Sequence, residues 1–349
     1  MSATTSVVDR QLLRSRTNAG LEAGRGRALL GMRVVLVLIA VVAAVSVGLG
    51  STSGLRYALA MGAVYALAAL ANGVVMGGLG EISLSTSAWL AVGAYVCGLA
   101  LEAGWAVGWA ILASIVVTAI IGFVVAIPTV RLRGIFTALA TFVLAWAVPQ
   151  SIIYLEPITG GSHGLSLPTG NTVLGLPLGG SSPGQLIFSY ICFTIAGLVT
   201  LALAESRIGR RVVWVGESES AAAVFGVKVT WVKVAVWTWS AAVAGLGGAL
   251  FALTVGFLSP DQFPATLGIN LFVVAVIAGS RSIWGAVLAG VLLAVVPTQL
   301  QSFIPSSATG IIFGVILLLA LLTGAGGLAK RVEWLILAAW RAVRGGRHA

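Results

Sequence analysis

The sequence has little charge and few of the side chains that enzymes use for chemistry. Only 9% of its 349 residues are Asp, Glu, Lys or Arg, whereas soluble chains carry about a quarter. Histidine occurs twice and no HExxH helix motif is present, which excludes the common zinc sites. The only aspartates, Asp9 and Asp261, lie outside the apolar runs, which excludes an intramembrane aspartyl protease. Ser162 and His163 are adjacent and cannot share a face as nucleophile and base, so nucleophilic catalysis is not expected.

The usual motif for nucleotide binding is also absent. No GxxxxGK[ST] segment occurs, so the chain cannot itself hold ATP in a phosphate-binding loop. Cys97 and Cys192 both lie in apolar runs, where we expect buried packing thiols rather than metal ligands or disulfide partners. We therefore expect no bound cofactor or metal, and no enzymatic activity of the chain alone.

Apolar residues are abundant and make up 59% of the chain. Several runs of about 20 residues contain no charge, which is the length that crosses ~30 Å of hydrocarbon. We predict an all-α polytopic membrane protein with about ten transmembrane helices. Spans eight and nine are short and glycine-rich, so one of them is a candidate re-entrant segment. The predicted spans are 32–49, 55–75, 85–101, 105–127, 136–153, 185–204, 234–257, 267–278, 284–300 and 308–323.

The distribution of basic residues predicts the orientation, because Lys and Arg favour the cytosolic side. With the N-terminus inside, nineteen of the twenty Lys and Arg residues fall on the cytosolic side and only Arg56 falls outside. Both termini are then cytosolic, and the loop 154–184 is external. A basic tail at 1–31 and an amphipathic basic tail at 329–349 flank a transmembrane domain at 32–328.

The basic residues are spread over short loops rather than gathered on one soluble face. The net charge of +10 therefore does not indicate nucleic-acid binding. The first 30 residues are polar and rich in arginine, so we expect no cleavable signal peptide.

Residues 205–233 form the only long polar interruption that concentrates both charge signs. Glu217 and Glu219 lie between arginines and lysines, in a stretch of helix-forming composition. Gly209 and Gly226 lie near the ends of this stretch, so we predict a short helix that lies across the cytosolic surface of the membrane. Such a helix is a suitable surface for a soluble motor protein to push. An ordinary cytosolic loop with a solvated helix is the alternative.

The predicted spans carry almost no ionisable group near their centres. Ion-coupled carriers usually keep such groups near the membrane midplane, where they bind the proton or cation. Glu81 is an acid that lies between two apolar runs, at a glycine-rich break. An uncharged path suits a conduit that is driven by a partner subunit. A stand-alone secondary carrier or channel for a small polar solute is the competing class.

Five segments together resemble the M-type (LivM-type) permease subunit of branched-chain amino-acid ABC transporters. The resemblance covers about residues 55–328, and the segments occur in the expected order. They are 72–95 (NGVVMGGLGEISLSTSAWLAVGAY), 131–141 (RLRGIFTALAT), 159–165 (TGGSHGL), 206–226 and 279–290. The chain departs from the family at Glu81, where glutamine is usual, and at Ser85, where glycine is usual. It departs again at Ser220, where the general importer pattern has a glutamate, and at 280–282, where small residues are usual.

The resemblance implies roles for four groups of residues. The coupling segment that would dock on an ATPase contains Arg210, Glu217, Glu219, Ala221, Ala222 and Gly226. A second contact with the ATPase or with anionic lipid headgroups is expected at Arg131 and Arg133, with simple membrane anchoring as the alternative. A contact with an external binding protein is expected at Gly160, Gly161, Gly164 and Asp261, with a structural glycine turn as the alternative. The translocation pathway is expected near Gly78, Gly80, Glu81 and Ser83, with a plain cytosolic turn as the alternative.

The resemblance also implies partners and a location. The partners would be a second homologous permease subunit, two cytosolic ABC ATPase subunits that bind the ATP, an external substrate-binding protein and membrane lipid. The location would be a bacterial cell membrane, which the chain crosses several times. The solute would be a branched-chain or related small amino acid, with urea or a short amide as the alternative.

Overall fold

The computed structural model of the chain describes residues 31, 34–132, 134–168, 170, 172–173, 175–279, 282–300 and 314–315. Within these ranges the chain is mostly helical, and five helices are long and apolar enough to cross a membrane. They are α2 (Ser53–Leu79), α4 (Val107–Thr129), α5 (Ile135–Tyr154), α7 (Pro183–Glu205) and α10 (Val229–Val255). The prediction of an all-α polytopic membrane protein is confirmed at this level.

Shorter apolar helices complete the described part of the bundle. They are the helix Val34–Leu49, α3 (Thr86–Glu102) and α12 (Ile283–Leu300). The predicted count of about ten spans is only partly accounted for. The tenth predicted span, 308–323, lies outside the described residues except at 314–315, and so do the predicted tails, apart from residue 31.

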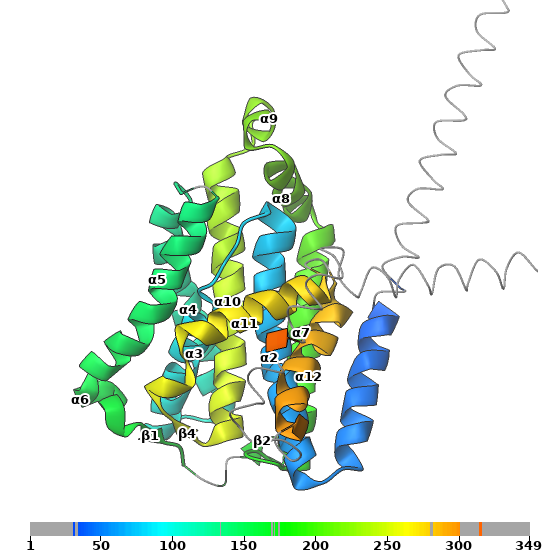
Figure 1. Cartoon of the computed structure of the whole chain (residues 1–349), viewed down its shortest axis with the longest axis vertical. Helices are drawn as coiled ribbons and strands as arrows, with labels where there is room; N and C mark the ends of the chain where they lie inside the picture. Colours follow the sequence, from blue (N-terminus) through cyan, green and yellow to red (C-terminus); the bar gives the residue numbers. More distant parts are fainter. Residues whose placement is uncertain are drawn as a thin grey trace, which may run out of the picture.

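Two antiparallel helices of 27 residues each, α2 and α10, form the centre of the bundle (Figure 1). Small residues let their neighbours approach closely, as is common between membrane helices. A Cβ at Gly248 of α10 would overlap the Leu90 carbonyl oxygen of α3. On the other side of the centre, a Cβ at Gly290 of α12 would overlap the Gly62 carbonyl oxygen of α2. The centre is therefore packed backbone against backbone.

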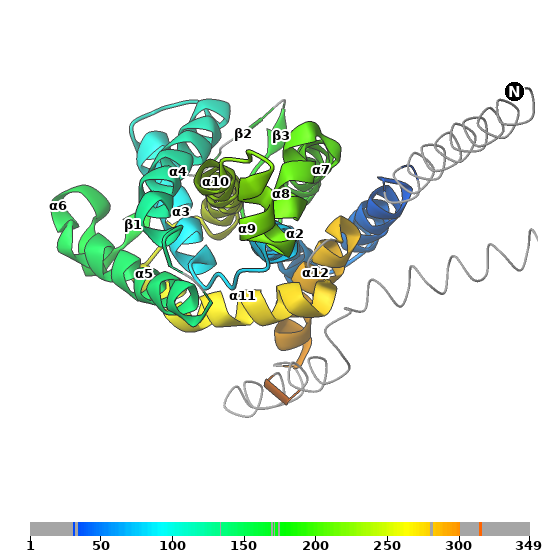
Figure 2. The same ribbon diagram turned by 90° about the horizontal axis from the view of Figure 1, so that it is seen from above.

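Each central helix is followed by a break and a shorter helix. Residues 80–85 lead from α2 into α3, and residues 256–264 lead from α10 into α11 (Ala265–Ala278). α11 runs obliquely across one face of the bundle, between α5 and α12 (Figures 1 and 2). Its 14 residues span about 21 Å, which is less than the ~30 Å of a hydrocarbon core.

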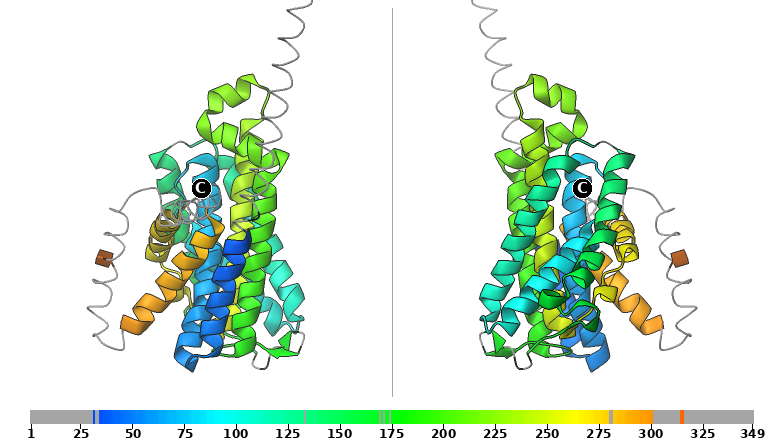
Figure 3. Two further views of the ribbon diagram at one scale, coloured as in Figure 1. Left: turned by 90° about the vertical axis from the view of Figure 1, so that its right-hand side faces the viewer. Right: turned by 90° about the vertical axis from the view of Figure 1, so that its left-hand side faces the viewer.

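The two ends of the bundle differ. At one end α8 (Arg207–Glu217) and α9 (Glu219–Val224) project beyond the other helices (Figure 3); we call this the α9 end. The opposite end, which we call the strand end, holds α6 (Glu156–Thr159) and four short strands. There β1 (Leu165–Ser166) pairs with β4 (Phe257–Leu258), and β2 (Thr172–Val173) pairs with β3 (Leu176–Pro177), both antiparallel.

Arg56, the one basic residue expected on the outer side, lies at the strand end, near the start of α2. Its guanidinium donates hydrogen bonds to three backbone carbonyl oxygens, those of Gly48 (3.2 Å), Ser51 (3.1 Å) and Ser181 (3.4 Å). Gly48 lies in the last turn of the helix Val34–Leu49, where a cation is favoured by the helix dipole. The exception to the charge rule therefore has a local structural cause.

Candidate functional site

The polar stretch at 205–233 folds as two helices rather than one. Ser206 caps α8 by accepting hydrogen bonds from the backbone N–H groups of Ile208 and Gly209, and Ser218 caps α9 by accepting one from Ala221. Ser218 is extended, with φ −160° and ψ 110°, so it separates the two helices. The single short helix predicted between about Gly209 and Gly226 is therefore broken at Ser218, because serine favours a cap position over a helix interior.

The predicted coupling residues divide by exposure. Ala222 is buried against the bundle, whereas Ala221, Arg210 and Glu217 are exposed. Gly226 ends α9 in the left-handed region with φ 78°. The Gly226 N–H donates to Ala223 and the Val227 N–H donates to Ala222, which is the Schellman arrangement. Ala222 and Gly226 thus hold α9 in shape and in place, while Ala221 remains accessible.

The tip of α9 is apolar and exposed, which the charge pattern did not reveal. Val224 and Phe225 are 85% and 78% exposed. The Phe225 ring lies 6.5 Å from the exposed Trp214 ring of α8. Large apolar side chains that protrude together mark a contact surface. We call Trp214, Val224 and Phe225 the apolar tip.

Arg131 lies at the same end of the bundle, in the turn between α4 and α5, and is exposed. Arg133, predicted to act with it, lies outside the described residues.

The break after α2 begins later than its glycines suggest. Gly78 is still inside α2, and Gly80 caps the helix with φ 71°. Residues 80–85 form neither helix nor strand and enter the protein, where Ser83 is buried and its hydroxyl hydrogen-bonds that of Ser85 (3.2 Å). The Leu84 N–H donates to Thr141 Oγ1 of α5 (3.1 Å). We call residues 80–85 the inner segment.

Glu81, the first side chain of the inner segment, belongs to a charged cluster that joins three elements. Lys233 Nζ lies 2.6 Å from Glu81 Oε1 and 2.6 Å from Glu219 Oε1 of α9. The Trp237 indole N–H donates to the second oxygen of Glu81 (3.0 Å). Lys233 is only 3% exposed, because α10 starts at Val229 and carries the end of the predicted loop 205–233 into the bundle. We call Glu81, Lys233 and Glu219 the charged bridge.

The residues predicted to face a binding protein lie together at the strand end. Gly160, Gly161 and Gly164 all have positive φ, and they form the turn that leads into β1. Asp261 is exposed in the turn Pro260–Gln262 that follows β4. Because β1 pairs with β4, the two turns are joined by a ladder, although nearly 100 residues separate them. A Cβ at Gly164 would overlap the Leu258 carbonyl oxygen, so this glycine also has a structural role.

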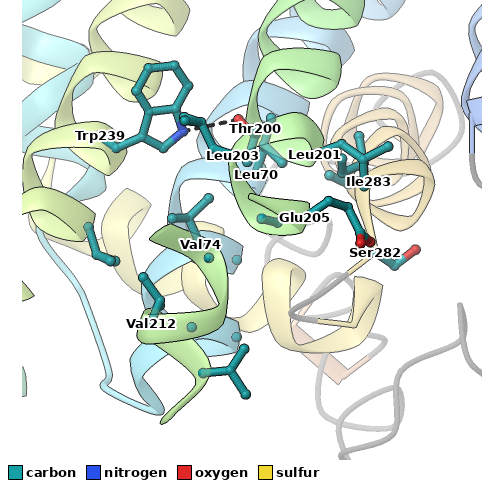
Figure 4. A pocket seen from close by; sticks show the side chains of 18 of the residues that line it. Leu70, Val74, Thr200, Leu201, Leu203, Glu205, Val212, Trp239, Ser282 and Ile283 are labelled. Carbon is teal, nitrogen blue, oxygen red and sulfur yellow. Dashed lines mark hydrogen bonds between the residues drawn. The ribbon is translucent and has the colours of Figure 1, made fainter. Parts of the chain in front are cut away.

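A cavity of about 420 Å³ lies between α2, α7, α8, α10, α11 and the start of α12 (Figure 4). Its lining is mostly apolar, with side chains such as Leu70, Val74 and Ile283. The Trp239 indole N–H donates to Thr200 Oγ1 (3.1 Å) on its wall, and Glu205 is its charged lining residue. A cavity of this size and character can hold a small aliphatic group. The sequence offered no signal for it, because its lining comes from six separate elements.

Within the described residues, no group of three or more His, Cys, Asp or Glu side chains could hold a metal ion. The charged bridge is a cluster of ionisable side chains among these residues, and it lies where α9, α10 and the inner segment meet.

Comparisons with known proteins find a matching family and several relatives. The family model described as "Branched-chain amino acid transport system / permease component" matches residues 54–321. The chain is 29% identical over 264 residues to the high-affinity branched-chain amino acid transport system permease protein LivM of Salmonella typhimurium, and 27% identical to LivM of Escherichia coli K12. Each match covers 69% of this chain and 62% of the LivM relative.

Further relatives are matched over more of their length. LivH of E. coli K12 is 25% identical over 288 residues, which is 78% of this chain and 93% of LivH. BraD of Pseudomonas aeruginosa is 28% identical over 258 residues, which is 68% of this chain and 82% of BraD. No solved structure matches the chain. On the match to residues 54–321, the chain belongs to the family of branched-chain amino acid transport system permease components.

Proposed function

We propose that this chain is the transmembrane permease subunit of an ABC importer for branched-chain or related small amino acids. The observation that carries the proposal is the exposed α9, with its apolar tip, held on an apolar helical bundle that belongs to this permease family. The chain has no phosphate-binding loop of its own, so a partner must bind the ATP. The relatives LivM, LivH and BraD are each named as branched-chain amino acid permeases, which favours the same solute class here.

In this proposal α9 is the coupling helix, and the α9 end faces the cytosol. A cytosolic ATPase would contact the apolar tip, Ala221 and the exposed charges Arg210 and Glu217, with Arg131 beside them. The other predicted coupling residues would support α9 without touching the ATPase. Ala222 and Glu219 hold α9 on the bundle, and Gly226 ends the helix. Two ATPases would serve this chain and a second homologous permease subunit.

The strand end would then face outward. The turn with Gly160, Gly161 and Gly164 and the turn with Asp261 are joined there, and they would contact an external substrate-binding protein. The large apolar side chains exposed on α4 and α5, including Ile120, Val124, Leu139, Val143 and Trp146, would face lipid or the second permease. With these assignments, the protein would lie in a bacterial cell membrane.

We place the translocation pathway along the inner segment and the cavity. Gly78 lines the cavity, and Gly80, Glu81 and Ser83 follow it along the chain. Irregular backbone at membrane depth is tolerated when protein or a water-filled cavity shields it, as a pathway would require. The apolar lining of the cavity is compatible with an aliphatic amino-acid side chain.

The test is purification of the tagged chain from its host in mild detergent, followed by identification of what copurifies. We expect ATPase subunits and a second permease. The same complex in proteoliposomes, with the binding protein present, should take up leucine only when ATP is supplied. Urea as a competitor tests the alternative solute. Recovery of the chain alone, with solute movement in the absence of ATP, would replace the importer by a stand-alone carrier.

A further inference from the structure

The charged bridge connects α9, the proposed coupling helix, to the inner segment, which lies on the proposed pathway. Glu219 is the first residue of α9, and Glu81 carries the first side chain of the inner segment. Lys233 lies between them on α10, with its ammonium 2.6 Å from a carboxylate oxygen of each. A single buried cation therefore joins α9 to the inner segment.

The attachment of α9 makes this contact important. α9 has six residues, and the extended Ser218 separates it from α8. Ala222 is its buried side chain, which presents only a methyl group to the bundle. The ion pair from Glu219 to Lys233 is thus a strong, directional side-chain contact between α9 and the membrane-embedded helices.

A movement of the inner segment would be passed on to the helices that it contacts. Its backbone forms neither helix nor strand, so it can move without breaking a ladder of hydrogen bonds. The Leu84 N–H donates to Thr141 of α5, and a Cβ at Gly268 of α11 would overlap the Leu84 carbonyl oxygen. A shift of Glu81 would therefore reach α5 and α11.

We propose that Lys233 is a positioning residue for transport, which transmits the displacement of α9 to the inner segment through Glu219 and Glu81. This inference rests on the proposed coupling role of α9. A buried ammonium between two carboxylates is suited to the task, because ion pairs remain strong where water is scarce. The ammonium also has three N–H donors, so it can follow both partners as they move.

The test uses the complete complex in membrane vesicles, with a reporter in the inner segment. Ser83→Cys is introduced after Cys97 and Cys192 are replaced by alanine, and the rate of maleimide labelling is measured with and without ATP plus vanadate. We expect trapping to change the labelling rate by about fivefold or more when Lys233 is present. In Lys233→Met the same treatment should change the rate by less than about twofold.

Two variants serve as matched controls. Lys228→Met removes an exposed lysine at the start of the same helix and should respond like the parent. Lys233→Arg keeps the positive charge and should restore most of the response. If Lys233→Met does not assemble, Glu219→Ala gives the answer, because it changes a partly exposed residue (34%) and removes the same link.

Three outcomes are informative. Loss of the response in Lys233→Met or Glu219→Ala, with ATPase subunits still bound, supports the inference. A response of parental size in both variants overturns it and leaves the charged bridge as a structural contact. Absence of any response in the parent, together with absence of ATPase subunits, means that the proposed function itself is wrong.

Discussion

Glu81 and Lys233 are 152 residues apart in the chain, yet the carboxylate of one lies 2.6 Å from the ammonium of the other where α2 meets α10. Both side chains are largely shielded, with exposures of 12% and 3%. Removing one partner of a buried ion pair leaves the other charge uncompensated, which is more costly than the pair itself is stabilising. The contact therefore predicts which substitutions lower the free energy of unfolding most.

We expect Lys233→Met to lower the free energy of unfolding by about 3 kcal/mol, because it leaves Glu81 without its cation. Glu81→Gln should cost less, about 1 kcal/mol, since its single amide oxygen still accepts from Lys233, which also keeps Glu219, while the Trp237 indole loses its acceptor. Thermal unfolding of the detergent-solubilised chain gives the order, with Lys228→Met as the control. A Glu81→Gln variant that is less stable than Lys233→Met would contradict this account of the cluster.

The close packing of α10 on α3 predicts an effect of a single methyl group. Gly248→Ala would drive a Cβ into the Leu90 carbonyl oxygen, and backbone cannot move aside as a side chain can. We expect a loss of about 2 kcal/mol, measured as a lower melting temperature. Gly108→Ala in α4 is the matched control, because no atom lies within 4 Å of the added Cβ and alanine favours a helix. Equal melting temperatures for the two variants would mean that α3 and α10 are less tightly packed.

The apolar tip predicts a specific loss of partner binding. Phe225→Asp places a charge at a position that is 78% exposed, so the fold should keep its melting temperature while ATPase copurification falls by about tenfold or more. Trp214→Ala should act in the same direction, because its ring adjoins Phe225. The control is Trp231→Ala, which removes an exposed ring that stacks on Phe123 instead. Undiminished copurification of Phe225→Asp would exclude the tip as the docking surface.

Gly226, by contrast, is a poor probe of docking. Its φ of 78° is unfavourable for any L side chain, so substitution strains the end of α9 whether or not a partner binds there. Ala222 has the same defect because it is buried. Of the coupling residues selected from the sequence, the exposed Arg210, Glu217 and Ala221 can report on docking without disturbing the fold.

The apolar runs predicted the long helices well. The predicted span 185–204 corresponds to α7 (Pro183–Glu205), and 105–127 corresponds to α4 (Val107–Thr129), because helix length follows the length of an uncharged run. The predicted span 234–257 begins later than α10, which starts at Val229, because the charge of Lys233 ends the uncharged run. Lys233 looks like a loop residue by charge, but in the structure its partners come from α9 and the α2–α3 break.

The candidate site was less accessible to sequence reasoning. A run of glycines marked the break near Gly80, but nothing local indicated that Glu81 would meet a lysine in a helix far along the chain. The apolar tip was missed because Val224 and Phe225 read as ordinary apolar residues, and only the short length of α9 leaves them exposed. Long-range pairing and exposure depend on how helices pack, which periodicity does not encode.

Arg56 gives a last prediction, at the strand end. Its guanidinium joins the end of the helix Val34–Leu49 to the loop before α7 by donating to the carbonyl oxygens of Gly48, Ser51 and Ser181. Arg56→Ala leaves three carbonyl groups without this donor, and we expect a loss of about 2 kcal/mol. Arg56→Lys keeps the charge but not the planar fork, so it should recover only part of that loss.

The measurement is the melting temperature of the solubilised protein, with Arg131→Ala as the control. Arg131 is an exposed arginine at the opposite end of the bundle, and its loss should change stability by less than about 0.5 kcal/mol. If only the positive charge of Arg56 mattered, Arg56→Lys would have the melting temperature of the parent and Arg56→Gln would lower it. If Arg56 stabilises the fold through its hydrogen bonds to the three carbonyl oxygens, the melting temperatures of Arg56→Lys and Arg56→Gln should both lie between those of the parent and Arg56→Ala. Each of these side chains retains N–H donors, but neither has five in one plane.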